Sequence, residues 1–228
     1  MRTLAATFDG LSIDVLETIE RAASEGPVRI TLASDADIMR STGAPPRLPE
    51  AERRYLAESI RWVDEVVASG GDLAETGAGL ECGEGVPPLP EPEPIVFVTG
   101  CYDWLHSGHV RFFEEASAFG RLHVTVGNDE SVTAHKGPGH PLFAAEVRRY
   151  LVGAVRHVHR ALVATGSGWL DAAPEMESLG AQVLIVNQDG DRPEKRDYCA
   201  LHGIAYHVLE RAPRPGLSRR SSTELRGY

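Results

Sequence analysis

Cysteine, lysine and long apolar runs are scarce in this chain of 228 residues. The three cysteines are an odd number at no metal-like spacing, which argues against a disulfide framework and against a zinc site. No apolar run approaches the roughly 20 residues of a membrane helix, and no signal-peptide core follows the first residues, so we expect a cytoplasmic protein without membrane insertion. Acidic residues outnumber basic ones by 33 to 23, and the net charge of −10 argues against binding nucleic acid or anionic lipid through a basic surface.

The rest of the composition is that of a folded protein. Hydrophobic residues make up 42% of the chain and charged residues 25%, which is enough apolar side chain for a packed core. Only Lys136 and Lys195 are lysines among the 23 basic residues. In a chain that otherwise uses arginine, a lysine can mark a place where a compact ammonium group is needed, or it can be a survivor of codon bias. All nine histidines lie between His106 and His207.

A proline-rich stretch divides the chain. Five of the eight residues over 87–94 are proline, which removes backbone donors and favours an extended, semi-rigid linker. We therefore predict a degenerate half-domain over 1–80, a linker over 81–94 and a complete catalytic domain over 95–228.

The two sides of this linker resemble each other. Residues 7–16 match 101–110, and 28–35 match 122–129, at a constant offset of 94. After one extra residue in the second copy, 53–56 match 148–151 and 60–63 match 155–158. Chance hardly supplies ordered blocks of this kind, so we interpret the chain as an old tandem duplication whose first copy is shortened.

Each copy alternates short strands with helices. Apolar, β-branched runs are separated by stretches with one apolar helical face, which favours right-handed crossovers and a parallel sheet. The predicted fold class is α/β, a Rossmann-like open parallel sheet preceded by a truncated, degenerate copy of the same βαβα unit. The predicted strands lie over 2–7, 28–33, 95–99, 122–127, 160–164, 183–187 and 205–209, and the predicted helices over 13–23, 50–61, 108–119, 144–157, 169–179 and 193–202, with a terminal turn from about 221.

The turn after the strand at 95–99 carries two histidines, His106 and His109, with Gly108 between them. In open α/β sheets, ligands bind beyond the carboxyl ends of the strands, and phosphate binds at the start of the next helix. The glycine spacing fits neither a P-loop nor a dinucleotide fingerprint. Two imidazole donors beside a helix N-terminus suit an anion that gains charge during a reaction. The alternative is a pair of surface histidines with no functional role.

The sequence around these histidines resembles a known signature. Gly-Cys-Tyr-Asp-Trp-Leu-His-Ser-Gly-His over 100–109 is similar to that of the HxGH nucleotidyltransferase superfamily, in particular the glycerol-3-phosphate, phosphocholine and phosphoethanolamine cytidylyltransferases. The resemblance covers most of 95–228 and continues in the segments 128–130, 136–137, 146–148 and 155–158. It ends in Arg220-Ser221-Ser222-Thr223, which resembles the family's phosphate-binding segment, although the spacing from Arg211 and Gly216 departs from that pattern.

This resemblance implies an enzyme that binds a nucleoside triphosphate with Mg²⁺, and a second substrate whose phosphate attacks the α-phosphorus in line and releases pyrophosphate. No covalent intermediate is needed, so catalysis rests on positioning and charge stabilisation. The resemblance also implies a homodimer, and Mg²⁺ bound mainly through the triphosphate rather than by protein ligands. The implied catalytic residues are His106, His109, Lys136 and Arg148. The implied nucleotide-binding residues are Thr99, Gly100, Cys101, Tyr102, Gly108, Asn187, Asp189, Arg220, Ser221, Ser222 and Thr223.

Four residues are candidates for binding the second substrate, each with a structural alternative: Asp103, Trp169, Gln188 and Lys195. Asp103 orients the turn or the metal, or merely accepts backbone hydrogen bonds. Trp169 stacks on a base or an acceptor, or belongs to the core. Lys195 binds substrate, or is a solvated helix residue. Gln188 lies in a segment that either sets specificity or is an ordinary strand-to-helix turn.

The first copy lacks this chemistry. Ser12, Asp14 and Val15 occupy the positions of the histidine motif, and Thr42 occupies that of the loop lysine. Because an aspartate repels phosphate, we expect residues 1–80 to bind no nucleotide. Half a sheet exposes an edge and an apolar face that must be covered, so we expect this half to pack on a catalytic unit.

Three functions are open at this point. The first is transfer of CMP from CTP to the phosphate or phosphonate of a small acceptor, which the details at Lys136, Arg148 and the terminal Ser-Thr segment favour. The second is an adenylyltransferase that uses ATP, and the third is a non-catalytic nucleotide-binding regulatory subunit. Choline phosphate, ethanolamine phosphate, glycerol phosphate, a sugar phosphate and a hydroxyalkylphosphonate all fit as acceptors, and the lack of an obvious aromatic cage argues weakly against a quaternary amine.

Overall fold

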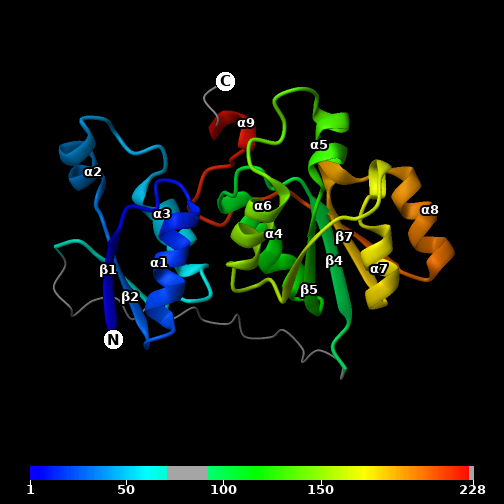
Figure 1. The fold of residues 1–228 in the computed structure, drawn as a ribbon, viewed down its shortest axis with the longest axis horizontal. Helices are drawn as coiled ribbons and strands as arrows, with labels where there is room; N and C mark the ends of the chain where they lie inside the picture. The colour runs from blue at the N-terminus through cyan, green and yellow to red at the C-terminus, as the bar shows by residue number, and fades with distance from the viewer. Residues whose placement is uncertain (71–91, 226–228) are drawn as a thin grey trace. The chain divides into compact units, whose positions relative to one another are not determined.

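The computed structural model describes residues 1–70 and 92–225, apart from the side chains of 223 and 224. It divides into two compact units, Met1–Pro87 and Pro88–Tyr228 (Figure 1). They are called the amino-terminal unit and the carboxy-terminal unit below. Most of the predicted linker over 81–94, and the end of the predicted half-domain, lie outside the described residues.

The amino-terminal unit contains a parallel three-stranded sheet in the order β1-β2-β3. Alternate residues of the middle strand, Val28, Ile30 and Leu32, are fully buried, because α1 and α3 contact this sheet. The first helix is capped by Ser12, whose side chain accepts a hydrogen bond from the backbone N–H of Val15. The elements are β1 (Arg2–Ala6), α1 (Ile13–Ala23), β2 (Val28–Leu32), α2 (Asp35–Thr42), α3 (Glu50–Glu58) and β3 (Glu65–Ala68).

Part of the other face of this sheet is polar, and the expectation that this half packs on a catalytic unit stays a prediction. Thr3, Arg29 and Glu65 stand in register on adjacent strands, and Arg29 Nε donates to Glu65 Oε2 at 2.6 Å. The positions that match Thr3 and Arg29 in the carboxy-terminal unit, Phe97 and His123, are buried there. An ion pair is compatible with water, so this row needs no apolar cover, whereas the next row of the same face contains Ala5 and Val67 beside Thr31.

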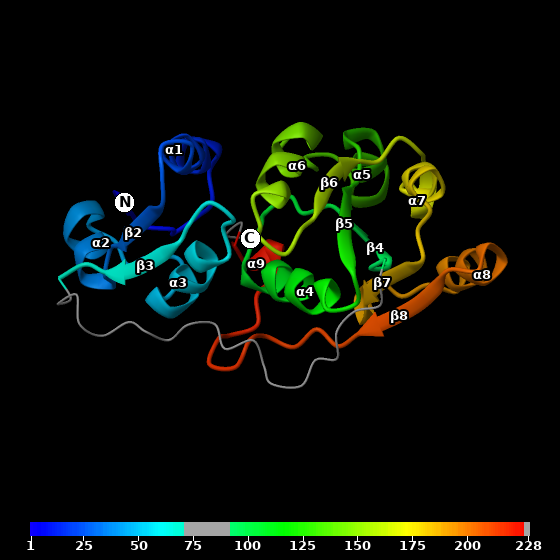
Figure 2. The same cartoon turned by 90° about the horizontal axis from the view of Figure 1, so that it is seen from below.

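Five parallel strands form the sheet of the carboxy-terminal unit, in the order β6-β5-β4-β7-β8, which confirms the predicted α/β class with an open parallel sheet. The chain starts at the central strand, moves to one edge and returns to the other, so the strand order reverses beside β4. Helices α4 and α6 cover one face of the sheet, and α7 and α8 cover the other (Figure 2). The elements are β4 (Ile95–Gly100), α4 (Ser107–Ser117), β5 (Arg121–Val126), α5 (Asp129–Lys136), α6 (Ala145–Gly153), β6 (Arg160–Val163), η1 (Gly168–Leu170), α7 (Ala173–Leu179), β7 (Val183–Asn187), η2 (Gln188–Gly190), α8 (Pro193–His202), β8 (Ala205–Leu209) and α9 (Ser222–Leu225).

Two elements at the carboxyl edge of this sheet differ from the predicted pattern. The loop expected after β5 contains the helix α5, because Asn128 Oδ1 accepts a hydrogen bond from the backbone N–H of Ser131 at 2.8 Å and caps a helix there. The helix expected over 169–179 is interrupted, since the 3-10 turn η1 precedes α7 and Pro174 occupies the first turn of α7. Both differences bring side chains to the carboxyl end of the sheet, which is where open α/β sheets bind ligands.

Candidate active site

Tyr102, whose backbone is left-handed, stabilises the loop after β4 through the packing of its ring. Tyr102 has a φ of 51°, and its ring packs edge to face against His109 and Phe113, with centroid distances of 5.2 and 5.1 Å. Gly100 permits this arrangement, because a Cβ at that position would lie 2.7 Å from Tyr102 Cζ. Both residues therefore shape the loop, and their part in nucleotide binding stays a prediction.

The two motif histidines lie together at the N-terminus of α4. His106 is the N-cap, and its Nδ1 accepts a hydrogen bond from the backbone N–H of Gly108 at 3.1 Å. The neutral form of the His106 ring therefore has its proton on Nε2. The rings of His106 and His109 stack at a centroid distance of 3.9 Å. A Cβ on Gly108 would lie 3.0 Å from His106 Cε1, so the glycine leaves room for the imidazole as well as for a ligand.

Burial and positive neighbours keep His109 uncharged. The pKa of His109 lies well below its ordinary value of 6.5, first because burial disfavours the cation and then because His106, Arg211 and Lys136 are close to it. A neutral His109 can stack on His106, where two cations would repel each other. His106 can donate Nε2–H to a phosphate oxygen. The His109 ring already hydrogen-bonds the backbone of Trp104, and the negative charge of a phosphate would favour a second proton on this ring.

We expect the unliganded protein to lose stability as the pH falls below about 6.5. A histidine whose pKa is lowered by folding binds fewer protons in the folded state, so its contribution is complete above the unfolded pKa and is lost as the pH falls toward the folded pKa. Urea titrations of the wild type and of His109→Asn between about pH 7.5 and about pH 5 measure this loss, which should be smaller in the variant. The exposed His202→Asn is the matched control, and equal pH dependence in the wild type and His109→Asn would contradict the lowered pKa.

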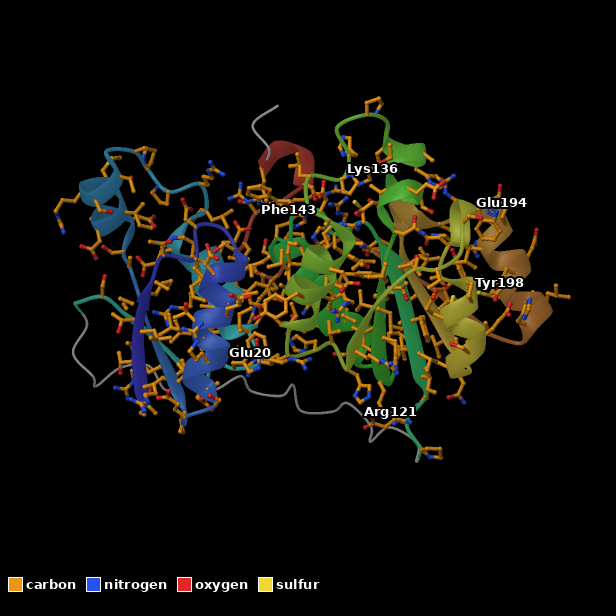
Figure 3. The ribbon with its side chains drawn as sticks, viewed as in Figure 1. Glu20, Arg121, Lys136, Phe143, Glu194 and Tyr198 are labelled. Carbon is orange, nitrogen blue, oxygen red and sulfur yellow. The ribbon has the colours of Figure 1, made fainter. Side chains whose placement is uncertain are left out.

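Lys136 ends α5 at the carboxyl edge of the sheet. Gly137 follows it with a φ of 87° and closes the helix by donating its N–H to Thr133 O at 2.9 Å. Figure 3 shows Lys136 at the end of the unit opposite Arg121, where β5 begins. Its charge helps to lower the pKa of His109, which places the ammonium group near the histidine pair.

Arg148 lies beneath the site rather than in it. Its side chain is fully buried and donates to the backbone carbonyls of Phe143 at 2.8 Å and of Cys101 and Gly127 at 2.7 Å. It also pairs with Asp129 at 2.7 Å. The expected catalytic role is therefore corrected: this guanidinium ties together the loops that follow β4, β5 and α5, and it acts as a positioning residue.

The amino-terminal unit contains the same arrangement around Arg53. This side chain is also fully buried, and it donates to the backbone carbonyls of Leu48, Thr7 and Ala33 at 3.1, 2.6 and 2.7 Å. It pairs with Asp35 at 2.6 Å. Each of these residues stands at the matching position of the repeat, although this unit carries no histidine motif. The buried arginine thus belongs to the fold in both units, and the tandem duplication remains our interpretation of the match.

Asp103 fixes the loop between α5 and α6. Its carboxylate is buried and accepts hydrogen bonds from the backbone N–H of Leu142 at 2.8 and 2.9 Å and of Phe143 at 3.0 Å. Asp9 does the same at the matching position, where it accepts from the N–H of Leu48 at 2.9 Å. The contacts therefore support the structural alternative for Asp103, and they correct its assignment as a substrate ligand.

The end of the chain folds back over the histidine loop. Ser222 Oγ donates to Trp104 O at 3.4 Å. Arg211, whose spacing departs from the family pattern, donates to Arg220 O at 3.1 Å and pairs with Asp189 at 2.8 Å. The structure thus gathers Arg211, Asp189 and Arg220 close to the histidine pair, and Arg211 is a site residue that its spacing in the sequence left in doubt.

A narrow crevice beside α4 collects several of the residues predicted to bind nucleotide. Its lining includes Ser107, Gly108, Asn187, Arg211 and Arg220. Gln188 is exposed and lines neither this crevice nor the cavity described next. Ser221 directly precedes α9, and the side chain of Thr223 lies outside the described part of the structure.

A larger cavity of about 180 Å³, called the side cavity below, opens next to the loop that follows β4. Lys195 is 7% exposed and donates from Nζ to Gly190 O at 3.1 Å, so it is not a solvated helix residue, and burial lowers its pKa. Trp169 is 41% exposed, so it does not belong to the core. The residues that line the side cavity are Thr99, Gly100, Cys101, Gly127, Ser131, Val132, His135, Lys136, Gly168, Trp169, Asp171, Arg192 and Lys195. Sequence reasoning missed His135, Asp171 and Arg192, for which no motif was a guide.

Metal ligands and membrane helices are not found in the described ranges. No group of three or more His, Cys, Asp or Glu residues within 1–70 and 92–225 could hold a metal ion. In the same ranges, no helix has the length and apolar character needed to cross a membrane. Magnesium supplied with a triphosphate stays a prediction.

A family model described as cytidylyltransferase-like matches residues 97–226, which is more than half of the chain. The chain belongs to this family. The chain is 49% identical over 136 residues to the bifunctional protein HldE of Pseudomonas fluorescens (strain Pf0-1) and 35% identical over 136 residues to that of Azotobacter vinelandii (strain DJ / ATCC BAA-1303). Each alignment covers 58% of this chain and 26% of the relative, so the chain spans about a quarter of the length of these relatives. A solved structure, the lipopolysaccharide core biosynthesis protein from Thermoplasma volcanium GSS1, is 22% identical, with 53% of this chain and 98% of that chain covered and a TM-score of 0.43.

Family membership supports a nucleotidyltransferase activity for the carboxy-terminal unit. The matched residues include the histidine pair, the crevice and the side cavity, so the whole candidate site lies in the cytidylyltransferase-like region. The described residues of the amino-terminal unit, 1–70, lie outside that match.

Proposed function

We propose that the carboxy-terminal unit transfers a nucleotidyl group from a nucleoside triphosphate to the phosphate of a small acceptor and releases pyrophosphate. The observation that carries this proposal is the stacked histidine pair at the N-terminus of α4, in which burial keeps His109 uncharged. Gly108 of the same motif lines the crevice, whereas Gly100 and Cys101 line the side cavity. The pair therefore adjoins one site suited to a nucleotide and another, lined by cations, suited to an acceptor phosphate.

In the proposed reaction, an oxygen of the acceptor phosphate attacks the α-phosphorus in line. The bond between this phosphorus and the oxygen that bridges to the β-phosphate breaks, and its electron pair leaves with pyrophosphate. His106 Nε2–H and the His109 ring donate hydrogen bonds to the oxygens on which charge builds, and the N-terminus of α4 adds partial positive charge. Lys136 supplies a mobile ammonium group at the same edge.

We propose that Mg²⁺ enters with the triphosphate. The side chains around the histidine pair are imidazoles and cations, whereas Mg²⁺ prefers oxygen ligands, so these residues do not form a site for the free ion. The triphosphate oxygens would hold the ion, and the chemistry it supplies is neutralisation of the phosphate charge.

We propose ATP as the nucleotide donor. The details at Lys136, Arg148 and the terminal Ser-Thr segment led to the expectation of CTP, but the histidine motif itself also serves ATP enzymes of the superfamily. The relatives that are 35% and 49% identical over 136 residues are named HldE proteins rather than cytidylyltransferases, which removes specific support for CTP. CTP is the second candidate, favoured by the description of the family and by the terminal Ser-Thr segment.

Pyrophosphate release with ATP, CTP, GTP and UTP, each against a panel of phosphorylated acceptors, tests this proposal. We expect kcat/KM for ATP to exceed that for CTP by at least about 10-fold, since recognition of different base edges commonly gives discrimination of this size. Faster release with CTP would replace ATP by the second candidate. Release with none of the four triphosphates would contradict the proposed function and favour a non-catalytic nucleotide-binding subunit.

A further inference from the structure

Asp171 is the one carboxylate among the residues that line the side cavity. Lys136, Arg192 and Lys195 line the same cavity with positive charge. None of the ion pairs found within the described ranges includes Asp171, so this carboxylate is not neutralised by a lysine or arginine within 4.0 Å. Opposite charges that face one cavity without pairing with each other leave both available to a ligand.

The position of Asp171 is tightly built. Gly166 donates its backbone N–H to Asp171 O at 2.9 Å, and Asn128 Nδ2 donates to the carbonyls of Ala164 and Gly166 at 3.2 and 3.0 Å. A Cβ on Gly127 would lie 3.1 Å from Asp171 Oδ2. The lack of a side chain at Gly127 therefore leaves space for the carboxylate to pack against the backbone. The end of β5 and the loop before α7 thus hold the carboxylate at the cavity wall.

The surroundings of Asp171 favour a neutral hydrogen-bond donor as its partner. The pKa of Asp171 is raised, first by burial, while the nearby charges of His135 and Lys195 act in the opposite direction. A partly buried carboxylate needs donors, and a hydroxyl supplies one without adding charge. An ammonium head group would also satisfy Asp171, but it would meet the repulsion of the cations around the same cavity.

We propose that Asp171 determines acceptor specificity by accepting a hydrogen bond from an acceptor hydroxyl, while the cavity lysines and Arg192 hold the acceptor phosphate. The acceptor is accordingly the phosphate ester of a sugar or another neutral polyol, and not that of an amino alcohol. The partly exposed ring of Trp169, in the same lining, offers an apolar face to the C–H groups of such a molecule. This inference rests on the proposed function and adds the class of acceptor to it.

The test compares a hexose 1-phosphate, glycerol 3-phosphate, phosphocholine and phosphoethanolamine as acceptors for the full chain. In the wild type, kcat/KM for the two polyol phosphates should exceed the values for the two amino-alcohol phosphates. Asp171→Ala should lower kcat/KM for the polyol phosphates by about 10- to 100-fold and leave KM for the triphosphate unchanged, because a hydroxyl loses its buried partner. Asp171→Asn should recover part of the loss, since its amide oxygen still accepts a hydrogen bond.

The matched control is Glu194→Gln, which removes the same charge from an exposed position on α8 outside the cavity lining (Figure 3). This variant should behave as the wild type. Equal losses in Glu194→Gln and Asp171→Ala, or a rise in KM for the triphosphate in Asp171→Ala, would overturn the inference by indicating a general charge effect or a structural role.

The outcomes separate this inference from the proposed function. A wild-type preference for phosphocholine or phosphoethanolamine would overturn the acceptor class and leave nucleotidyl transfer intact. Absence of pyrophosphate with every acceptor would contradict nucleotidyl transfer itself. Titration calorimetry of polyol phosphate binding would then test the inference. Binding of a polyol phosphate that is lost in Asp171→Ala supports it, and binding that is unchanged overturns it.

Discussion

Alanine at His106 or His109 is expected to lower kcat for pyrophosphate release by about 10²- to 10⁴-fold. Both imidazoles donate to oxygens that gain charge in the transition state, so kcat should fall much further than KM for the triphosphate changes. The rings stack at 3.9 Å and act on the same phosphate group, so the double variant should lose less than the product of the two single effects. Steady-state kinetics of the three variants measures these losses.

His106 is also the N-cap of α4, so the chemistry must be separated from the capping. His106→Asn keeps a side-chain acceptor for the helix N-terminus but has no imidazole, so it should be as inactive as the alanine variant and more stable by about 1 kcal/mol. Ser12→Ala removes the matching cap in the amino-terminal unit and should leave turnover within about twofold of the wild type. Alanine variants of the histidines that keep near wild-type turnover would contradict their role.

Replacing Arg148 by methionine is expected to cost about 3 to 5 kcal/mol of the unfolding free energy of the carboxy-terminal unit. The guanidinium is fully buried, and its loss would leave three backbone carbonyls and Asp129 without their partner. Turnover should fall as well, because the loops that carry the histidines and Lys136 lose their common anchor. Urea unfolding of the carboxy-terminal unit, followed together with activity, measures both effects.

Arg53, the counterpart of Arg148 in the amino-terminal unit, allows a matched control variant. Arg53→Met removes the same buried contacts from the amino-terminal unit, so it should destabilise that unit to a similar extent while the turnover of folded protein stays unchanged. Arg149→Met changes the half-exposed neighbour of Arg148 and should shift stability by less than about 0.5 kcal/mol. If Arg148→Met kept full stability and lost only triphosphate binding, Arg148 would be a phosphate ligand and not an anchor.

The sequence predicted the parallel sheet and the histidine pair because both depend on local patterns. The strands are short apolar runs between helices with one apolar face, and His106, Gly108 and His109 are adjacent in the chain at a strand-to-helix turn. Their stacking and the uncharged state of His109 needed the structure, since one of its causes is the charge of Arg211, about a hundred positions away.

Other features were missed or misassigned because the same residue type serves two purposes. An arginine at the start of a helix looks the same in sequence whether it binds phosphate or backbone carbonyls, as Arg148 does. An aspartate after the first strand can bind substrate or hold a loop, and Asp103 holds one. Asp171 belongs to no motif, and only the packing of its loop against Gly127 brings it to the side cavity.

If the acceptor phosphate attacks the α-phosphorus and displaces intact pyrophosphate, every oxygen of that phosphate ends in the nucleotidyl product. The direct measurement is mass spectrometry of the products formed from unlabelled ATP and an acceptor labelled with ¹⁸O throughout its phosphate. We expect the full label in the nucleotidyl product, which contains AMP, and none in pyrophosphate. Label in pyrophosphate, or release of ADP and orthophosphate in place of pyrophosphate, would contradict nucleotidyl transfer by this chain.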